Sequence, residues 1–316
     1  MKTTINWGIL APGRIAHKFA SDLKLVPGAH LHAVASRSLE RATAFASEHG
    51  VAHTFGNYRE LLECPDLDVV YIASPHTEHC AHTLLCLEKK IPVLCEKPFA
   101  MNRAQAQRMV AAARANDTFL MEALWTRFVP TFEEMLRLLQ DGAIGELKML
   151  RADFGFRANF PPEHRVFNTS LGGGALLDVG IYPIYLALAT LGMPENIKAS
   201  AVFGESGADD SCALIFEYPG NRLAVLDASI ALKTNTEAFL YGEKGTIHLH
   251  ARFHQPHELS LSFYDKPSEH VAIPFTGYGY FHEIVEVNEC LLAGKKESEK
   301  MPLHFSLQMM EVLDWA

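Results

Sequence analysis

The feature that most constrains the fold is an alternation of short apolar runs and amphipathic segments in the first part of the chain. Strands rich in Val, Ile and Leu, separated by helical patterns of about 10–15 residues, are typical of βαβ units with right-handed crossovers. The predicted strands are Ile5–Leu10, Leu31–Ala35, Val69–Ala73, Val93–Cys95 and Phe119–Ala123. The predicted helices between them are Ile15–Leu25, Leu39–His49, Glu78–Glu88 and Ala104–Asn116. Residues 1–124 are therefore expected to form a doubly wound parallel sheet, the Rossmann architecture.

The pattern changes after Trp125. The predicted elements are then a helix after Pro130, a strand at Leu147–Phe156, a helix at Ala175–Leu191, repeated strands over 197–273, and helices at Phe281–Ala293 and Leu303–Trp315. Strands framed by helices indicate an α+β domain on one open, mostly antiparallel sheet. The chain of 316 residues has room for two domains of roughly 150 residues each. The second domain is predicted to span residues 125–316.

Composition excludes several classes of function. The formal net charge is −9 and no block of basic residues occurs, so nucleic acid is not an expected partner. The start MKTTINWGIL lacks the pattern of a secretory signal, and no run of ~18 apolar residues is apparent that would span a membrane. The six cysteines show no C-x-x-C spacing, which favours free thiols in the reducing cytoplasm.

A glycine motif stands between the first strand and the first helix. Residues Ala11–Ala16 read A-P-G-R-I-A, which is G-x-G-x-x-G with alanine in the first and last places. Gly13 would let the backbone approach a pyrophosphate, and the helix that opens at Arg14 and Ile15 would offer free N–H groups. Ala11 departs from the pattern because the tight turn normally takes glycine. A simple structural turn is the alternative reading.

The end of the second strand bears on the choice of cofactor. An enzyme for NAD usually carries Asp or Glu about 20 residues after the glycine motif, where it binds the ribose 2′-hydroxyl. This chain has Ser36 and Arg37 there, and Arg41 follows one helical turn later. A cation with hydroxyl groups suits a 2′-phosphate, so NADP is predicted in preference to NAD, which stays possible. The alternative is a solvated helix start capped by a serine.

Two further motifs carry candidate catalytic groups. The fifth strand ends in Glu96-Lys97-Pro98, which places a lysine at the carboxyl edge of a parallel sheet, where ligands bind in such folds. Farther on, Asp178 and Tyr182 are four residues apart and are expected on one face of a helix. Gly180 between them is expected to leave room for a ligand.

Together these motifs resemble the glucose-fructose oxidoreductase/inositol dehydrogenase/MocA family over essentially the whole chain. The resemblance rests on A-x-G-x-x-A, on E-K-P at 96–98 and on G-G-x-x-x-D-x-G-x-Y at 173–182. Residues 121–128 and 177–182 resemble the family's dimeric dihydrodiol dehydrogenase branch, whose members oxidise trans-dihydrodiols and some aldoses with NADP. The resemblance implies that Lys97 and Tyr182 are catalytic. It also implies a loop beside the nicotinamide formed by Ser74, Pro75, His76 and His79, with His76 in place of the more usual Asn.

The chemistry of this pair is consistent with alcohol oxidation. A base must take the hydroxyl proton while hydride leaves for the nicotinamide, and a free tyrosine, with a pKa near ~10, is too weakly acidic to serve. An ammonium about 4 Å away contributes roughly 4 kcal/mol at an effective dielectric constant of ~20. That is enough to lower the pKa of Tyr182 by up to about three units before desolvation opposes it. Asp178 could position Lys97 or a substrate hydroxyl. A half-buried core tyrosine is the alternative.

The substrate is less well defined by the sequence. An aromatic, partly polar surface could hold a sugar, a polyol or a dihydrodiol ring, although each of its residues is also a plausible core residue. The candidates are Trp125, Arg127, Phe154, Phe156 and Phe160, together with Asp178 and Tyr182.

Three further expectations concern a group of histidines, the oligomeric state and the alternative functions. The histidines His248, His250, His254 and His257 lack a carboxylate or cysteine at ligand spacing, so a solvated or interface strand edge is expected there and no metal. A homodimer is predicted through the exposed face of the C-terminal sheet, which needs a cover. A non-catalytic dinucleotide-binding sensor is the alternative function, whereas a short-chain dehydrogenase is excluded because no tyrosine has lysine four residues later.

Overall fold

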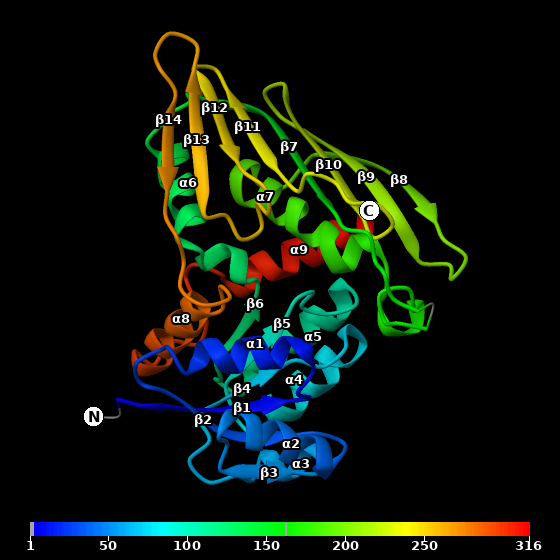
Figure 1. Cartoon of the computed structure of the whole chain (residues 1–316), viewed down its shortest axis with the longest axis vertical. Helices are drawn as coiled ribbons and strands as arrows, with labels where there is room; N and C mark the ends of the chain where they lie inside the picture. The colour runs from blue at the N-terminus through cyan, green and yellow to red at the C-terminus, as the bar shows by residue number, and fades with distance from the viewer. Residues whose placement is uncertain (1–2, 162) are drawn as a thin grey trace. The chain divides into compact units, whose positions relative to one another are not determined.

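The computed structural model describes residues 3–161 and 163–316, which form two compact units (Figure 1). Unit 1 comprises the chain up to Phe128 together with Thr276–Met310. Unit 2 comprises Val129–Phe275 and Glu311–Ala316. The segment Thr276–Met310, which the sequence analysis placed in the second domain, thus packs with the N-terminal part of the chain.

Unit 1 is built on a six-stranded parallel sheet with the strand order β3-β2-β1-β4-β5-β6. Its strands are β1 (Ile5–Leu10), β2 (Ala29–Ala35), β3 (His53–Phe55), β4 (Val69–Ile72), β5 (Val93–Glu96) and β6 (Leu120–Ala123). Its first helices are α1 (Arg14–Leu23), α2 (Leu39–His49), α3 (Tyr58–Leu61), α4 (His79–Glu88) and α5 (Arg103–Ala115). The predicted Rossmann fold is confirmed. The strand order reverses between β1 and β4, and in open sheets of this kind ligands bind beyond the carboxyl ends of the strands at that point.

The C-terminal segment joins unit 1 through a buried carboxylate. Asp22, on α1, is 1% exposed and accepts hydrogen bonds from the backbone N–H groups of Tyr278, Tyr280 and Phe281 at 2.8–3.2 Å. These groups lie at the start of α8 (Phe281–Leu292), whose first N–H groups have no partner within the helix. The indole of Trp7 also donates to Asn288 of α8 at 3.0 Å.

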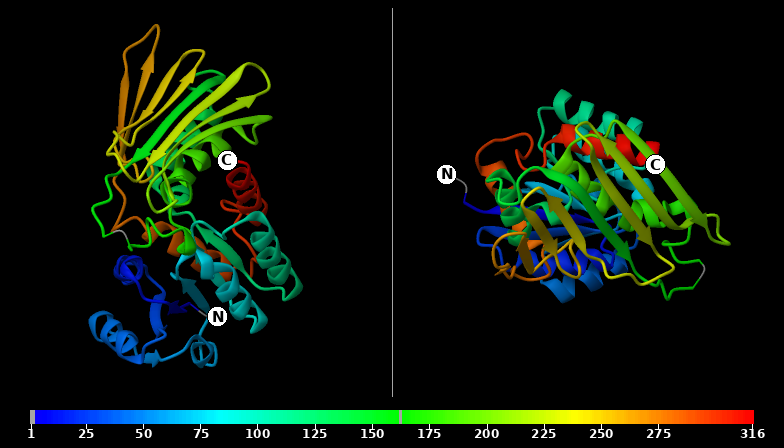
Figure 2. Two further views of the ribbon diagram at one scale, coloured as in Figure 1. Left: turned by 90° about the vertical axis from the view of Figure 1, so that its right-hand side faces the viewer. Right: turned by 90° about the horizontal axis from the view of Figure 1, so that it is seen from above.

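Unit 2 is built on an eight-stranded sheet with the order β14-β13-β12-β11-β7-β10-β9-β8 (Figure 2). Only β7 and β10 pair in parallel, so the predicted open, mostly antiparallel sheet is confirmed. The strands are β7 (Leu147–Gly155), β8 (Asn196–Phe203), β9 (Asp209–Tyr218), β10 (Arg222–Ser229), β11 (Ala238–Gly242), β12 (Gly245–Leu249), β13 (Glu258–Phe263) and β14 (Glu269–Ala272). The helices are α6 (Pro130–Gln140) and α7 (Ile181–Leu191), and α9 (Leu303–Trp315) ends in this unit.

One helical stretch of unit 2 differs from expectation. By length and composition, Thr169–Leu191 could cross a membrane, since its most apolar window has a mean hydropathy of 1.6. The expectation that the chain has no such run is therefore wrong. However, 78% of its most apolar window is buried inside the protein, as in a core helix. The stretch is also not one regular α-helix, because Leu176–Gly180 (η4) forms a π-helical turn before α7.

Candidate active site

The turn after β1 has the geometry that a pyrophosphate needs. Gly13 is the N-cap of α1 and no side chain caps that helix. A Cβ added at Gly13 would meet no atom within 4 Å, so the approach to the backbone is open. Ala11 adopts a left-handed conformation, with φ of 65°, which explains why glycine is usual there and shows that the turn forms with alanine. The first N–H groups of α1, from Arg14 and Ile15 onward, are suited to a phosphate.

The loop after β2 presents two cations. Arg37 and Arg41 are exposed, whereas Ser36 is 8% exposed and its hydroxyl accepts a hydrogen bond from Ser38 N at 3.3 Å. Ser38 is the N-cap of α2 and accepts from Arg41 N, so a serine does cap this helix. The cap uses the serine hydroxyl and the backbone of Arg41 only. Both guanidinium groups therefore stay available to an anion.

The charge of Arg37 acts on Tyr58 of α3 and on His82 of α4. Burial raises the pKa of Tyr58, and the charge of Arg37 lowers it by a smaller amount. Burial lowers the pKa of His82, and the charge of Arg37 lowers it further. The two rings are 4.7 Å apart, and Nδ1 of His82 lies 3.0 Å from the hydroxyl of Ser74. His82 therefore links Ser74 to the surroundings of Arg37. The sequence analysis did not single out His82, because it lies inside an ordinary amphipathic helix.

His79 ties two loops of the sheet edge together. It is 0% exposed, and its ring nitrogens lie 2.8 Å from the carbonyl oxygen of Pro98 and 2.9 Å from that of Ser74. Burial lowers the pKa of His79 to about 4, so the ring is neutral near pH 7 and donates one proton to one carbonyl at a time. The nearby His76 is 7% exposed. It begins a short 3-10 turn, His76–Glu78, whose N-cap is Pro75. His79 thereby fixes the backbone around Lys97–Pro98.

The turn after β5 carries the predicted lysine. Glu96 is 8% exposed and accepts hydrogen bonds from the hydroxyl of Tyr71 and, at 3.1 Å, from Lys97 N. Burial, followed by the charge of Glu96, raises the pKa of Tyr71 well above its ordinary value, so this phenol remains a donor. The Lys97–Pro98 peptide bond is cis. The side chain of Lys97 is partly exposed, as a group that meets a ligand must be.

Two buried acids lie near this turn. Glu122 on β6 is 0% exposed and accepts from Phe99 N at 3.0 Å, and burial raises its pKa to about 7. Glu283 on α8 is also 0% exposed, and neither of its carboxylate oxygens has a hydrogen-bond partner in the part of the chain that the structure describes. Burial, with the charges of Glu96 and Asp22, raises the pKa of Glu283 well above its ordinary value. Burial therefore favours the neutral, protonated form of Glu283.

Two predicted substrate residues lie on the 3-10 turn Trp125–Phe128 of unit 1. The indole of Trp125 stacks on Tyr280, with ring centroids 4.8 Å apart. Nε of Arg127 donates to the carbonyl oxygen of Lys300 at 3.0 Å. Both side chains are thus fixed by the C-terminal segment of unit 1. Their contact with substrate stays a prediction.

In unit 2, Tyr182 belongs to a cluster of three rings, Phe154, Tyr182 and His254, called here the ring cluster. The centroid of Tyr182 lies 5.4 Å from that of Phe154 and 5.2 Å from that of His254, and these two stack at 4.3 Å. Tyr182 is 6% exposed and His254 is 7% exposed. The sequence analysis grouped His254 with a solvated strand edge; that interpretation is wrong, because the loop between β12 and β13 returns this residue to β7.

Asp178 has a partner that the sequence did not indicate. Its Oδ1 lies 3.1 Å from Nη1 of Arg165, and Asp178 is 6% exposed. Asp178 lies in the π-helical turn and Tyr182 in α7, so they do not share one regular helix. A Cβ at Gly180 would contact Ala228 of β10 at 3.4 Å. The expected room for a ligand at Gly180 is therefore wrong, since this glycine serves the close packing of helix on sheet.

The other predicted aromatic residues lie in the same unit. Phe156 and Phe160 pack against a buried core that includes Val166 and Val179, and Phe160 also stacks on His164 at 4.0 Å. Their alternative interpretation as packing residues therefore holds. Phe154 packs against the same core and in addition contacts Tyr182.

Comparison with known proteins identifies the family. A family model described as the oxidoreductase family with an NAD-binding Rossmann fold matches residues 5–124, and the GFO/IDH/MocA C-terminal domain matches residues 132–248. The chain is 40% identical over 322 residues to a trans-1,2-dihydrobenzene-1,2-diol dehydrogenase of Danio rerio, covering 99% of this chain and 96% of that protein. The chain belongs to the GFO/IDH/MocA oxidoreductase family. The human protein of the same name is 35% identical, with 98% of this chain and 95% of that protein covered.

Solved structures agree with the fold. An aldose-aldose oxidoreductase from Caulobacter crescentus superposes with a TM-score of 0.90 at 22% identity, covering 99% of this chain and 96% of that chain. The 3-ketoreductase KijD10 from Actinomadura kijaniata, solved with NADP and TDP-benzene, superposes with a TM-score of 0.88 at 25% identity, covering 98% and 96%. It has also been solved with one tyrosine replaced by phenylalanine and, separately, with one lysine replaced by alanine.

The family gives the chain its general activity. It is an enzyme, an oxidoreductase that uses a nicotinamide dinucleotide. The residues of unit 1 fit this cofactor: an open glycine turn before an uncapped helix, a cationic loop after β2, and a rigid turn around Lys97.

Proposed function

We propose that the enzyme transfers hydride between NADP and a secondary alcohol or hemiacetal of a sugar or trans-dihydrodiol, with Tyr182 as the acid–base group and Lys97 lowering its pKa. The observation that carries the proposal is the ring cluster, which surrounds the phenol of Tyr182 with Phe154 and His254. Hydride removal from a carbinol requires a positioned acceptor for the hydroxyl proton, and the ring cluster fixes the position of the phenol. The names of the relatives, which are dihydrodiol dehydrogenases and sugar oxidoreductases, support the substrate class.

Each side chain has a defined task in this proposal. The nicotinamide, when bound, accepts the hydride. Tyr182 takes the hydroxyl proton during oxidation and returns it during reduction. Asp178, already paired with Arg165, accepts a hydrogen bond from a second substrate hydroxyl. Phe154 supplies the apolar surface beside the ring that carries the reacting carbon.

The preference for NADP follows from the loop after β2. Arg37 and Arg41 are exposed, and the cap of α2 leaves both guanidinium groups available. Two cations beside the ribose would pair with a 2′-phosphate. We propose the same cofactor-binding residues that were expected from the sequence. Among them, Glu96, His76 and His79 belong to the loops that would lie beside the nicotinamide.

A substrate screen tests the activity. Purified enzyme is given trans-dihydrodiols, aldoses or inositols, with NADP and NAD in parallel, and cofactor reduction is followed by absorbance. The proposal predicts turnover of a dihydrodiol or aldose with NADP. Tight NADP binding without turnover of any of these compounds would instead support the non-catalytic sensor.

We also propose a homodimer formed through the open face of the eight-stranded sheet. Figure 2 shows this sheet from above, and no helix of the described part of unit 2 covers the face turned to the viewer. Partly exposed rings lie on its strands: Phe239 stacks on His248 at 4.1 Å and on Tyr241 at 6.0 Å. Light scattering at micromolar concentration should give twice the mass of the chain, and Phe239→Lys should give a monomer.

A cytoplasmic location is proposed because all six cysteines are free thiols.

A further inference from the structure

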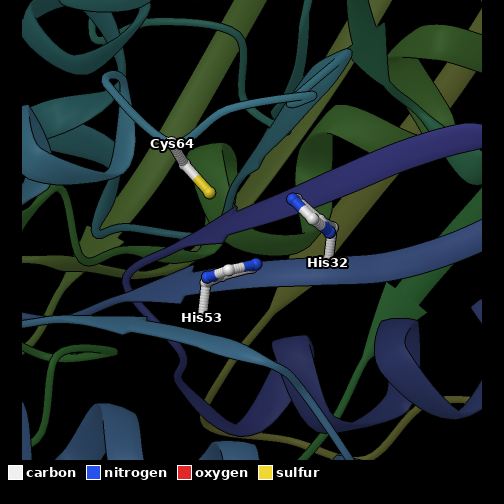
Figure 3. A group of neighbouring side chains, drawn as sticks. All are labelled: His32, His53 and Cys64. Carbon is white, nitrogen blue, oxygen red and sulfur yellow. The ribbon is translucent and has the colours of Figure 1, made fainter.

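Unit 1 brings together two histidines and a cysteine at a place that the reaction does not use. The side chains are His32 on β2, His53 on β3 and Cys64 in the loop that follows α3 (Figure 3). One donor atom from each residue lies within 4.8 Å of the other two. The rings of His32 and His53 are 4.6 Å apart at their centroids. Figure 3 shows all three side chains directed into the same space.

The backbone explains why His32 points there. The register between β1 and β2 shifts after Trp7, which pairs with Leu31 while Gly8 pairs with Ala33. His32 is therefore an extra residue in its strand, and such a bulge redirects a side chain. Nε2 of His32 also lies 2.9 Å from the carbonyl oxygen of Pro65, so the ring and the loop that carries the cysteine are already held together.

The donor set has the chemistry of a zinc site. Two imidazole nitrogens and one thiolate are ligands that Zn²⁺ binds tetrahedrally, with a water in the fourth position. Donor atoms around such a zinc lie about 3.3–3.8 Å apart, given metal–ligand distances of ~2.0–2.3 Å. Atoms within 4.8 Å of one another reach that spacing by small side-chain rotations. Cys64 is 7% exposed, and its sulfur otherwise meets only the carbonyl oxygen of Pro65 at 3.7 Å among the hydrogen bonds in the described residues.

Two other groups of histidines and acids in the described chain lack this character. His17, Glu48 and His49 form one group, and Glu237, His248 and His250 form the other. In each, a histidine is already paired with the carboxylate, at 3.1 Å for His17 and 3.6 Å for His248. Neither group contains a thiol, which is the ligand that favours zinc over harder cations.

The geometry points to a zinc-binding site formed by His32, His53 and Cys64 that fastens the edge of the six-stranded sheet. β3 is a three-residue strand at that edge, and the metal would join it to β2 and to the loop after α3. We assign this metal a structural role, because none of its three ligands belongs to the residues proposed for cofactor binding or hydride transfer.

Cobalt provides the direct test, because a thiolate bound to Co²⁺ gives an intense charge-transfer band in the near ultraviolet. The full-length, reduced protein, with NADP present, is titrated with Co²⁺ and then with Zn²⁺ as competitor. We expect the band to saturate at one Co²⁺ per chain, to disappear on addition of Zn²⁺, and to be lost in Cys64→Ser. His53→Ala should weaken Zn²⁺ binding at least about tenfold.

Matched controls separate this site from chance binding. His30→Ala removes an adjacent ring, 5.7 Å from that of His32, and Cys212→Ser removes a thiol of unit 2; both should keep the band. Zn²⁺ should raise the melting temperature of the wild type but not of Cys64→Ser, and the turnover of both should stay equal within about twofold. Absence of the band in the wild type, or its persistence in Cys64→Ser, would overturn the assignment.

Discussion

The edge of the sheet in unit 1 and the ring cluster in unit 2 are built in different ways. Around Lys97, ionisable groups are buried and held by the backbone: the pKa of His79 is lowered to about 4 and that of Glu122 is raised to about 7, both chiefly by burial. Around Tyr182, the neighbours include the aromatic rings of Phe154 and His254, and Asp178 forms an ion pair with Arg165. In the first region, burial shifts the pKa of both groups toward their neutral forms, and both groups hydrogen-bond to the backbone. The second surrounds a phenol with rings, as suits a group that exchanges a proton.

The largest expected effect belongs to the second region. Tyr182→Phe keeps the ring and its contacts but removes the proton acceptor, so turnover should fall by roughly 10² to 10⁴ while NADP binding is unchanged. Stopped-flow or steady-state rates with the best substrate measure the loss. Tyr218→Phe is the matched control, since the buried hydroxyl of Tyr218 has no hydrogen-bond partner in the described structure. Turnover within threefold of wild type in Tyr182→Phe would remove this tyrosine from the mechanism.

The next effect concerns stability in the first region. The pKa of Glu122 in the folded protein is about 7, above its ordinary value of 4.5, so the folded state holds the proton more tightly and loses stability as the pH rises between these values. At ~1.4 kcal/mol per pKa unit, the loss from this group amounts to about 3 kcal/mol above pH 7. Glu122→Gln should abolish this loss of stability. Relative to the wild type, the free energy of unfolding of the variant, measured in urea, should therefore increase mostly between pH 5 and pH 8. The exposed Glu60→Gln should show no such gain. A difference between Glu122→Gln and wild type that does not change with pH would refute the assignment.

A smaller effect is expected at the cofactor loop. Arg37→Asp replaces a charge-assisted hydrogen bond worth about 1.5–3 kcal/mol with a repulsion. The KM for NADP should therefore rise by about tenfold to a hundredfold. The KM for NAD should stay constant or fall. Arg114→Asp, on the exposed end of α5, controls for net charge. Equal use of both cofactors by the wild type would contradict the role given to Arg37.

The smallest effect tests the turn after β1. Ala11 holds a φ of 65°, which costs a non-glycine residue about 1–2 kcal/mol, although glycine would lose more chain entropy on folding. Ala11→Gly should therefore stabilise unit 1 by up to about 1 kcal/mol, as measured by urea unfolding. Ala16→Gly, at a buried helical position of α1, should destabilise it by about 1 kcal/mol. Destabilisation by Ala11→Gly would show that the turn is not strained.

The sequence predicted the sheets better than the surroundings of the site. Five of the strands of unit 1 were apparent because buried parallel strands are continuous apolar runs, whereas β3, with three partly exposed residues, gave no such signal. The positions of Lys97, Asp178 and Tyr182 followed from motifs. Their partners did not.

Those partners come from distant segments or from inconspicuous positions. Arg165 reaches Asp178 from a loop, His254 reaches Tyr182 from the loop between β12 and β13, and His82 meets Ser74 from within α4. None of them stands at a spacing that periodicity or a motif could detect. Only the tertiary packing brings them to these sites.

The central claim is that the two regions serve one proton transfer. Lys97→Met, Tyr182→Phe and the double variant, measured on one substrate at saturating NADP, test it as a cycle. If Lys97 acts through the phenol, the double variant should be no slower than Tyr182→Phe within about threefold, because groups that act as a unit do not contribute independently. The residual activity of Lys97→Met should also need a higher pH. Losses that multiply in the double variant, with no shift of the pH profile in Lys97→Met, would contradict the account.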